Sequence, residues 1–386
     1  MKTQTLEDGT IIQSVAEEQK LWYDDVKDLQ LATEKVRGEL MNKKNVIGVG
    51  FGLKKEKGKL TDRVAIIAFV DKKIGRRSVA KRDLIDSQME GFETDVQEEV
   101  YTVKIPKAPA GQGVGDKLTL GTSCGCAVGV TAGTNGDLFR RDGIIYLFWN
   151  AHVATGNVAA NNSEWPAECI MPGLYDGGKP GVDRVGDRKY VTKLCTPEIT
   201  GATVDGALIK PDDPLRLTAK QEGIGMYKGT CLFQLGDKVI KSGRTTGVTE
   251  GVVTALGVTV RVGYGNHPVT GDPLYQTFID QIQFSDFSDG GDSGSSIAKK
   301  DTKQVGAKLY AGSSTSTIGF PIQHAESLFG GKLVTSIDGE EPDPEPDPEP
   351  DPDPEPPEKG KTLFTVDLKI GAVISVTGTI TKEEVK

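Results

Sequence analysis

The stretch of the sequence with the clearest chemical potential is SDGGDSGSSIA at 288–298, which gathers three glycines around Asp292 and Ser293. Glycines at this density are typical of a tight turn whose backbone adopts angles that other residues avoid. Such a turn can hold a serine beside backbone N–H groups that point at a substrate. A serine hydroxyl is a weak nucleophile until a base takes its proton, so a catalytic Ser293 requires a histidine.

His152 is the best placed of the three histidines in the chain. It follows the apolar run YLFWNA, and a histidine at a strand end can be held rigidly while its ring faces a cleft. His267 lies in the loop sequence GYGNHPVTGDP, and His324 lies in a segment predicted to be helical, PIQHAESLF. We therefore predict that His152 is the base that serves Ser293.

An acid must then hold the imidazole tautomer and stabilise the imidazolium. Asp205 is the candidate because it heads the apolar run GALIK, where a carboxylate is costly unless it has a partner. Asp183 and Asp187 are its rivals, but their polar surroundings, VDRVGDRK, are typical of surface charge.

The chain order His, Asp, Ser resembles that of the chymotrypsin-like (trypsin-like) serine peptidases. NAHV around His152 and VDGALIK around Asp205 are similar to that family's histidine and aspartate motifs, and GGDSGS is similar to G-D-S-G-G with Ser295 in place of the last glycine. The spacing suits two consecutive barrels with the triad in the cleft between them. The resemblance implies that Ser293 attacks a carbonyl and that the N–H groups of Gly291 and Ser293 form the oxyanion hole.

A further segment, KSGRTTGVTEG, resembles the streptogrisin and α-lytic branch of that family. There the arginine pairs with the aspartate that precedes the nucleophile, which implies an ion pair between Arg244 and Asp292. A buried Asp292 needs a cation to hold the loop that shapes the oxyanion hole, and Arg244 supplies one without proteolytic processing.

Residues Ala311, Gly312 and Ser313 resemble the family's substrate-binding strand, which pairs with an extended peptide by β-addition. The specificity pocket is then expected near 287–290 and 313–316. No fixed charge in these two segments demands a particular substrate side chain.

A broader resemblance links residues 40–330 to a group of bacterial trypsin-like proteins that is related to the plant narrow-leaf-type proteins. The matching segments are NVIGVGFG, RVAIIAFVDKKI, GFETDV, GTSCGCAVG, GRTTG, GDSGSSI and LYAGSSTSTIGFPI. This resemblance implies an N-terminal α+β domain ahead of a peptidase core.

Several kinds of element must position these residues. Helical periodicity predicts a helix over 11–41, and β-branched runs at 46–53 and 63–70 predict strands. GVGFG at 48–52 lacks dinucleotide-loop spacing and is interpreted as a glycine-containing strand. The predicted fold is mainly β, a chymotrypsin-like double Greek-key barrel core after a small α+β domain. The expected divisions are an α+β domain at 1–108, a peptidase domain at 109–337, an acidic Pro-rich linker at 338–360 and a β-prone tail at 361–386.

Composition and charge limit the other function classes. Eleven acidic residues lie in 338–358, so the rest of the chain carries a net charge of only +2, which gives no indication of nucleic-acid binding. No apolar run has the length of a signal peptide or a membrane span, so the expectation is a cytoplasmic protein that binds no membrane. Five cysteines and three histidines at unsuitable spacings predict free thiols, no metal site and no cofactor.

The sequence therefore predicts a serine endopeptidase that hydrolyses peptide or protein substrates through an acyl-enzyme. The alternative is a catalytically weak or inactive binding or scaffold protein on a peptidase fold, with which Ser295 and the acidic tether are compatible. Two further hypotheses are that the N-terminal domain keeps the enzyme latent and that the tail 361–386 docks on a partner.

Overall fold

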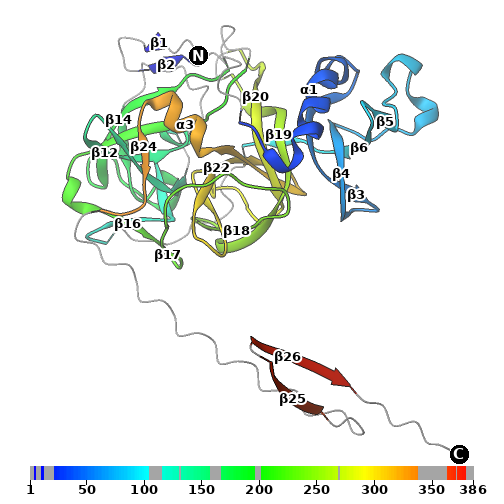
Figure 1. Cartoon of the computed structure of the whole chain (residues 1–386). Coiled ribbons are helices and arrows are strands. Elements are labelled where there is room, and N and C mark those ends of the chain that lie inside the picture. Colours follow the sequence, from blue (N-terminus) through cyan, green and yellow to red (C-terminus); the bar gives the residue numbers. More distant parts are fainter. Residues whose placement is uncertain are drawn as a thin grey trace, which may run out of the picture. The chain divides into compact units, whose positions relative to one another are not determined.

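The computed structural model describes residues 21–103, 115–129, 132–156, 167–195, 201–267 and 270–337, and the backbone of short strands nearer both ends of the chain. The chain forms two compact units, 1–342 and 343–386. In the second unit, β25 (Leu363–Ile370) and β26 (Ala372–Thr379) form an antiparallel pair (Figure 1).

One sheet of the first unit closes into a barrel. Its strands follow one another in the order β18 (Lys238–Gly243), β21 (Ser296–Lys299), β22 (Val305–Gly312), β23 (Ser316–Pro321), β20 (Pro273–Ser285) and β19 (Gly247–Asn266). Because β18 also pairs with β19, the ladder returns to its first strand (Figure 1). Runs rich in Val, Ile and Thr, such as VVTALGVTV in β19, favour these strands.

A second sheet is built mostly from strands that precede the barrel in the sequence. Its main path is β10 (Gly133–Asn135), β9 (Thr122–Cys126), β13 (Glu168–Ile170), β14 (Arg184–Thr192), β15 (Ala207–Pro211), β12 (Ile144–Trp149), β11 (Asp137–Arg141) and β24 (Lys332–Val334). Beside this path β2 (Thr10–Ile12) joins β14 and pairs with β1 (Gln4–Thr5). A small sheet contains β17 (Gly225–Met226), β16 (Leu217–Gln221) and β8 (Leu118–Leu120). The helices α2 (Ala151–Ala154) and α3 (Ile322–Phe329) follow β12 and β23 directly.

The N-terminal strands extend the barrel sheet. After β19 the sheet continues through β3 (Val46–Glu56), β4 (Lys59–Val70), β6 (Phe92–Glu98) and β5 (Gln88–Met89), and β7 (Tyr101–Thr102) joins it beside β19 and β22. The glycines of β3 allow its backbone to lie close to that of β19, since a Cβ at Gly52 would overlap the carbonyl oxygen of Thr254 in β19. The prediction of a glycine-containing strand at this place is confirmed.

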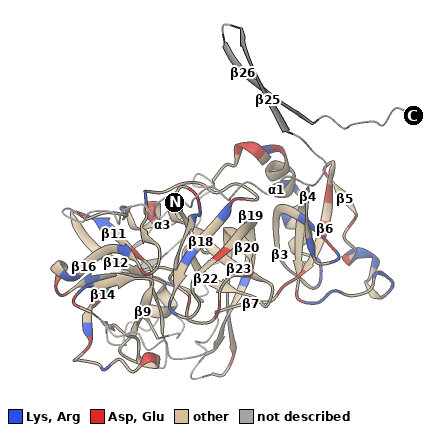
Figure 2. Ribbon diagram, turned by 90° about the horizontal axis from the view of Figure 1, so that it is seen from below, with Lys and Arg blue, Asp and Glu red and all other residues tan. Residues whose placement is uncertain are grey.

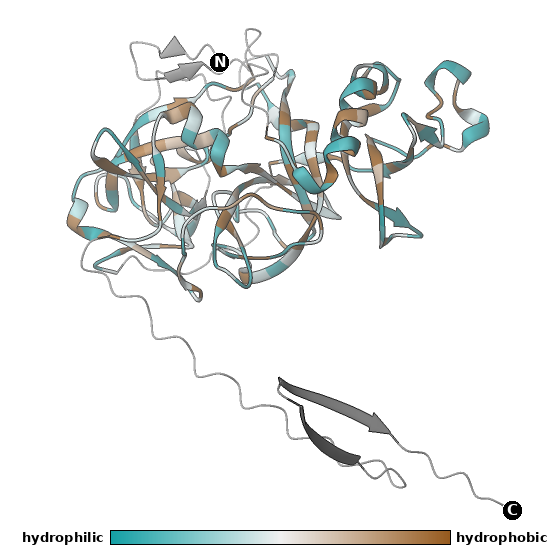
Figure 3. Cartoon of the chain, in the orientation of Figure 1, coloured by the Kyte–Doolittle hydropathy of each residue, from teal (hydrophilic) through white to brown (hydrophobic). Residues whose placement is uncertain are grey.

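The predicted helix over 11–41 starts too early. Helix α1 spans Lys27–Met41, while Thr10–Ile12 is strand β2 and residues 13–20 lie outside the described part. The chain at 21–23 is not helical because its N–H groups bond elsewhere: Leu21 N donates to Asp280 at 3.1 Å and Tyr23 N to Gln30 at 3.2 Å. Hydrophobic and hydrophilic residues alternate along α1 (Figure 3), and its apolar buried residues are Leu29, Ala32, Val36 and Leu40.

The prediction of a mainly β chain with a small N-terminal helical part is confirmed. None of the helices in the described residues is long and apolar enough to cross a membrane. The five cysteines are free, and each is buried or half-buried, as the sequence predicts. The domain division at 108 stays a prediction. Strands from both sides of it are hydrogen-bonded in one sheet.

Candidate active site

His152 and Asp205 form a direct hydrogen-bonded pair. Helix α2 begins as soon as β12 ends, and this fixes His152 at the strand end. Its Nδ1 lies 2.6 Å from Asp205 Oδ2, and its backbone N–H donates to Oδ1 of the same carboxylate at 3.2 Å. Because the carboxylate can only accept, Nδ1 carries the proton and Nε2 is left to act as a base.

Two further side chains hold Asp205, which is fully buried. The hydroxyl of Tyr264 donates to Asp205 Oδ2 at 2.7 Å, the same oxygen that faces His152. Burial and the nearby Asp205 charge raise the pKa of Tyr264 well above its usual value, so the hydroxyl keeps its proton. Asn150 Nδ2 donates to the Asp205 carbonyl at 2.8 Å. Sequence reasoning missed Tyr264, for which GYGN at the end of β19 offers no local signal.

The loop that carries Ser293 depends on its glycines. Gly291 and Gly294 have φ values of +99° and +103°, which strain any residue with a Cβ. Ser293 Oγ donates to the carbonyl of Tyr310 in β22 at 3.3 Å, and the Ser293 carbonyl accepts from Thr134 N at 2.7 Å. The loop is therefore fixed to β22 on one side and to β10 on the other.

The same strand β10 also contacts the turn that carries His152. A Cβ at Gly133 would lie 2.9 Å from the Ser293 carbonyl oxygen and 2.7 Å from Val153 Cγ1, in helix α2. Gly133 is thus packed between Ser293 and the neighbour of His152, and a larger residue would separate them.

The hydrogen bonds of the loop leave two N–H groups free. Within residues 289–295, five N–H groups donate to protein acceptors: those of Asp289, Gly290, Asp292, Gly294 and Ser295. In the same part of the chain the N–H groups of Gly291 and Ser293 donate to none. Buried N–H groups normally have partners, and two unpaired donors on either side of one residue can together hydrogen-bond an anionic oxygen. The oxyanion hole at Gly291 and Ser293 stays a prediction.

Ser295, the departure from the family motif, has a structural role in the loop. Its Oγ donates to the Asp292 carbonyl at 2.7 Å, and its backbone N–H donates to the same oxygen at 3.0 Å. The hydroxyl therefore tightens the turn and leaves the free N–H groups of Gly291 and Ser293 untouched.

The predicted ion pair between Arg244 and Asp292 is wrong. The cation beside Asp292 is Lys241 of β18, whose Nζ lies 3.4 Å from Oδ2, and both side chains are fully buried. The carboxylate also accepts from the N–H groups of Thr245 at 2.8 Å and Thr246 at 3.1 Å. These partners and the N–H of Asp289 occupy the carboxylate, so no room is left for a guanidinium.

Arg244 pairs with Asp176 instead. Its Nε donates to Asp176 Oδ2 at 2.8 Å and its Nη2 donates to Oδ1, which makes a bidentate and fully buried pair. Arg244 still lies against the loop, because a Cβ at Gly291 would lie 3.0 Å from its Cδ. Its predicted role as a support of the loop stays a prediction, with a different partner.

A second buried lysine lies under the loop. Lys308 Nζ donates to the Gly294 carbonyl and to Asp137 Oδ2, both at 2.6 Å, and lies 4.6 Å from the centre of the Phe148 ring. Burial lowers the pKa of Lys308, while Asp137 opposes that change. The loop is thus held by two buried lysine–aspartate pairs, neither of which was predicted from the sequence.

Ser293 and His152 do not hydrogen-bond to each other in the described structure, where Ser293 Oγ donates to Tyr310. Each is only 6% exposed. Catalytic hydrogen bonds are often long or misaligned without substrate, so this geometry is compatible with a base that engages the serine only on binding.

The predicted substrate-binding residues lie at the end of β22. Ala311 and Gly312 face Ile318 and Thr317 of β23, and Gly312 also faces Thr102 of β7. Ser313 has left the strand, and its N–H donates to Ser316 at 2.8 Å. Part of the predicted peptide edge is therefore already paired within the chain.

The other histidines lie away from this arrangement. His324 Nε2 is 3.0 Å from Asp280, in a separate buried pair, and His267 Nδ1 accepts from Thr270 N at 3.2 Å. The rival acids bond to neighbours on the surface, Asp183 to Lys179 N and Asp187 to Arg184.

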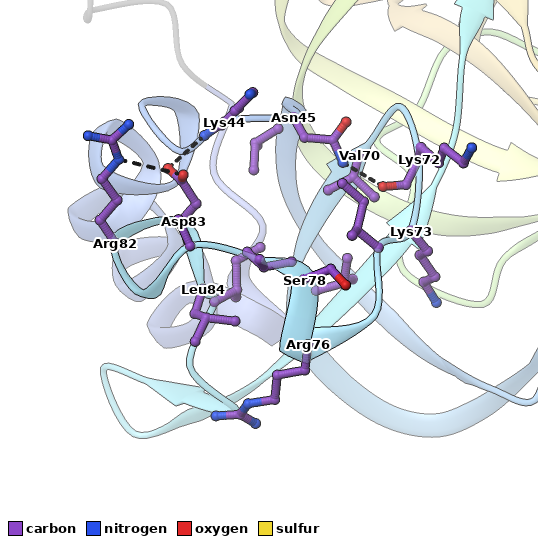
Figure 4. A pocket seen from close by; sticks show the side chains of 16 residues that line it. Lys44, Asn45, Val70, Lys72, Lys73, Arg76, Ser78, Arg82, Asp83 and Leu84 are labelled. Atoms are coloured by element: carbon purple, nitrogen blue, oxygen red, sulfur yellow. Dashed lines mark hydrogen bonds and ion pairs between the residues drawn. The ribbon is translucent and has the colours of Figure 1, made fainter.

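The N-terminal part of the chain holds a cavity of about 570 Å³ that none of the predicted site residues lines. It lies between β4 and the loop that follows, where Lys and Arg gather (Figure 2). Arg76 and Arg82 extend away from it, while Asp83 accepts from Lys44 N (Figure 4). Basic and apolar side chains thus share the lining of this cavity.

The chain is similar to solved structures of serine proteases. One is a glutamic acid specific serine protease, 19% identical over 56% of this chain and all of that one, with a TM-score of 0.38. Nocardiopsis protease (NAPase) and Cellulomonas bogoriensis chymotrypsin are each 18% identical over 57% of this chain and all of theirs, with TM-scores of 0.40 and 0.39. No protein-family model and no curated protein matches the chain.

Proposed function

We propose that the protein is a serine endopeptidase of the chymotrypsin-like type, with Ser293, His152 and Asp205 as its triad. The observation that carries the proposal is the pair of unpaired N–H groups at Gly291 and Ser293, in a loop whose other N–H groups are used. A loop that served only as a turn would have no reason to leave two shielded donors without acceptors.

The mechanism follows from the bonds of the site. Ser293 Oγ adds to the substrate carbonyl while His152 Nε2 takes its proton, and Asp205 balances the imidazolium charge. The carbonyl oxygen becomes an oxyanion held by the N–H groups of Gly291 and Ser293. The imidazolium then gives its proton to the leaving amine, the acyl-enzyme remains, and water repeats the sequence to release the acid and restore the serine.

A fluorophosphonate probe tests this function directly, because it bonds only to a serine activated by a base. Wild-type protein is expected to be labelled, and Ser293→Ala to be unlabelled. Ser87→Ala, which changes an exposed serine outside the candidate site, is the control and should label as wild type. Labelling that survives in Ser293→Ala, or wild type that stays unlabelled with the rest of its chain folded, would contradict the proposal.

The second candidate is a peptidase-fold binding or scaffold protein. The bond from Ser293 Oγ to Tyr310 and the low exposure of His152 favour it, since they describe a closed rather than an open site. Wild-type protein and Ser293→Ala that bind the same peptides equally, with no turnover by either, would support this function.

The tail at 361–386 is proposed to dock on a partner. Its two strands form an antiparallel pair, and a two-stranded hairpin alone is only marginally stable in water. Deletion of residues 340–386 should reduce partner capture without lowering the melting temperature of the remainder. Unchanged capture by the shortened chain would refute this role.

A further inference from the structure

Strand β7 lies on the edge of β22 that faces the candidate nucleophile. The edge of β22 opposite β23 pairs with β21 as far as Lys308, and the Leu309 N–H donates to Ser295 at 3.0 Å. The next residue, Tyr310, accepts from Ser293 Oγ. Farther along the same edge, Gly312 pairs with Thr102 of β7. A peptide that lay along this edge from Ser293 would therefore meet β7.

The direction of β7 is also that of a bound peptide. Because β7 is antiparallel to β22, the residues after Thr102 run back along β22 toward Tyr310 and Ser293. On its other side, Thr102 pairs with Gly263 of β19, whose carbonyl accepts from Val103 N at 3.2 Å. The strand thus lies between two barrel strands at the place where β-addition of a substrate is predicted.

A buried carboxylate anchors this segment. Glu99 has a side-chain exposure of only 1%, and its oxygens accept from the hydroxyls of three residues, with distances of 2.9 Å from Thr315 and 3.0 Å from Ser316. The third is Ser313, and Lys55 Nζ lies 3.5 Å away. These hydroxyls belong to the segment 313–316 that the sequence assigns to substrate specificity.

We propose that residues 99–103 are an internal pseudosubstrate. They occupy the peptide-binding edge of β22, and the hydroxyls of Ser313, Thr315 and Ser316 form a subsite for an acidic substrate side chain, which Glu99 fills. This inference rests on the proposed peptidase function and adds its regulation and a substrate class: extended peptides with a carboxylate upstream of the bond that is cut.

The first test removes the anchor. Glu99→Ala should raise the kcat/KM for an extended peptide by about tenfold, because weaker docking of β7 increases the fraction of protein with a free edge. Glu99→Gln, which keeps the shape, should lie between it and wild type. Val182→Ala is the control, since Val182 lies outside residues 99–103 and is 76% exposed, and it should leave the rate unchanged. Melting temperatures show whether each variant is folded.

The second test follows β7 itself by hydrogen–deuterium exchange. When a peptidyl phosphonate with glutamate at the matching position occupies Ser293, the amides of Thr102 and Val103 should exchange faster than in free protein. In Glu99→Ala, peptides with glutamate at that position should be cut about tenfold faster than those with glutamine, and Thr315→Ala should reduce this preference.

The outcomes separate the two proposals. If wild type and Glu99→Ala react with the fluorophosphonate and the peptide at equal rates, and exchange at 102–103 does not change with the inhibitor, the pseudosubstrate is refuted while the peptidase stands. If neither protein reacts although both are folded, the peptidase function itself fails.

Discussion

The pair of Lys241 and Asp292 gives the sharpest test of how the loop is held. In Lys241→Met, Asp292 would keep the bonds from Thr245, Thr246 and the N–H of Asp289, but its buried charge would have no cation. Breaking a buried pair in this way typically costs about 3–5 kcal/mol. Because several donors remain, we expect a loss near the lower figure, about 3 kcal/mol of the free energy of unfolding.

Urea denaturation of four proteins measures this: wild type, Lys241→Met, Asp292→Asn and the double variant. The double variant should be more stable than the sum of the single losses by at least about 1 kcal/mol, because the second change removes the stranded charge. Lys238→Met, in the exposed part of the same strand, is the matched control and should stay within about 0.5 kcal/mol of wild type.

A loss below about 0.5 kcal/mol in Lys241→Met would refute the reasoning, since it would mean that the carboxylate needs no cation. A second cycle, between Arg244 and Asp292, separates the observed pairing from the predicted one. Its coupling energy should be clearly smaller than that between Lys241 and Asp292, because Arg244 bonds to Asp176.

The pH dependence has a definite sign. Burial lowers the pKa of Lys241 below its usual 10.5, and Asp292 opposes the change. Between the lowered pKa and 10.5 the unfolded chain binds more protons at this group than the native chain, so this lysine makes the free energy of unfolding rise with pH. The free energy of unfolding of wild type, relative to that of Lys241→Met, should therefore increase as pH rises through that window.

Three further perturbations test other parts of the site. Gly136→Ala places a Cβ onto the Gly294 carbonyl oxygen and should lower the free energy of unfolding by at least about 2 kcal/mol, measured by denaturation. The same variant should also lose fluorophosphonate labelling. Tyr264→Phe removes a donor to the triad carboxylate and should lower kcat about tenfold with little change in KM; an unchanged kcat would show that the hydroxyl does not position the triad. Burial raises the pKa of Cys195 to about 12 and that of Cys231 to about 11. At pH 8 both thiols should therefore react with a disulfide reagent at least about tenfold more slowly in native than in denatured protein. Equal rates in the two states would contradict this effect of burial.

Features that depend on short local motifs could be predicted from the sequence, whereas side-chain pairings between distant segments could not. His152, Asp205 and Ser293 each stand in a local pattern, and the strand end, the apolar run and the glycine turn all formed. The partner of Asp292 has no such pattern, because it depends on which of two buried cations near the end of β18 points toward Asp292. Only the register of the barrel places Lys241 there and turns Arg244 toward Asp176.

The start of α1 and the place of Glu99 were missed for the same reason. The periodicity before residue 27 resembles a helix, but the bond from Leu21 N to Asp280 joins segments far apart in the sequence and holds the chain extended. The contact of Glu99 with Thr315 likewise crosses most of the chain. Neither pairing has a local signal, so composition and spacing could not reveal it.

The continuity of β3 with β19 bears on how this protein can be divided. A chain shortened to begin at 109 would lack β3, β4 and β7, and the N–H and C=O groups of β19 around Ala255–Gly263 would lose their neighbours. An open strand edge of this length is a template for pairing with a second molecule. The isolated barrel is therefore expected to associate with itself, because in the whole chain β3 and β7 cover this edge of β19.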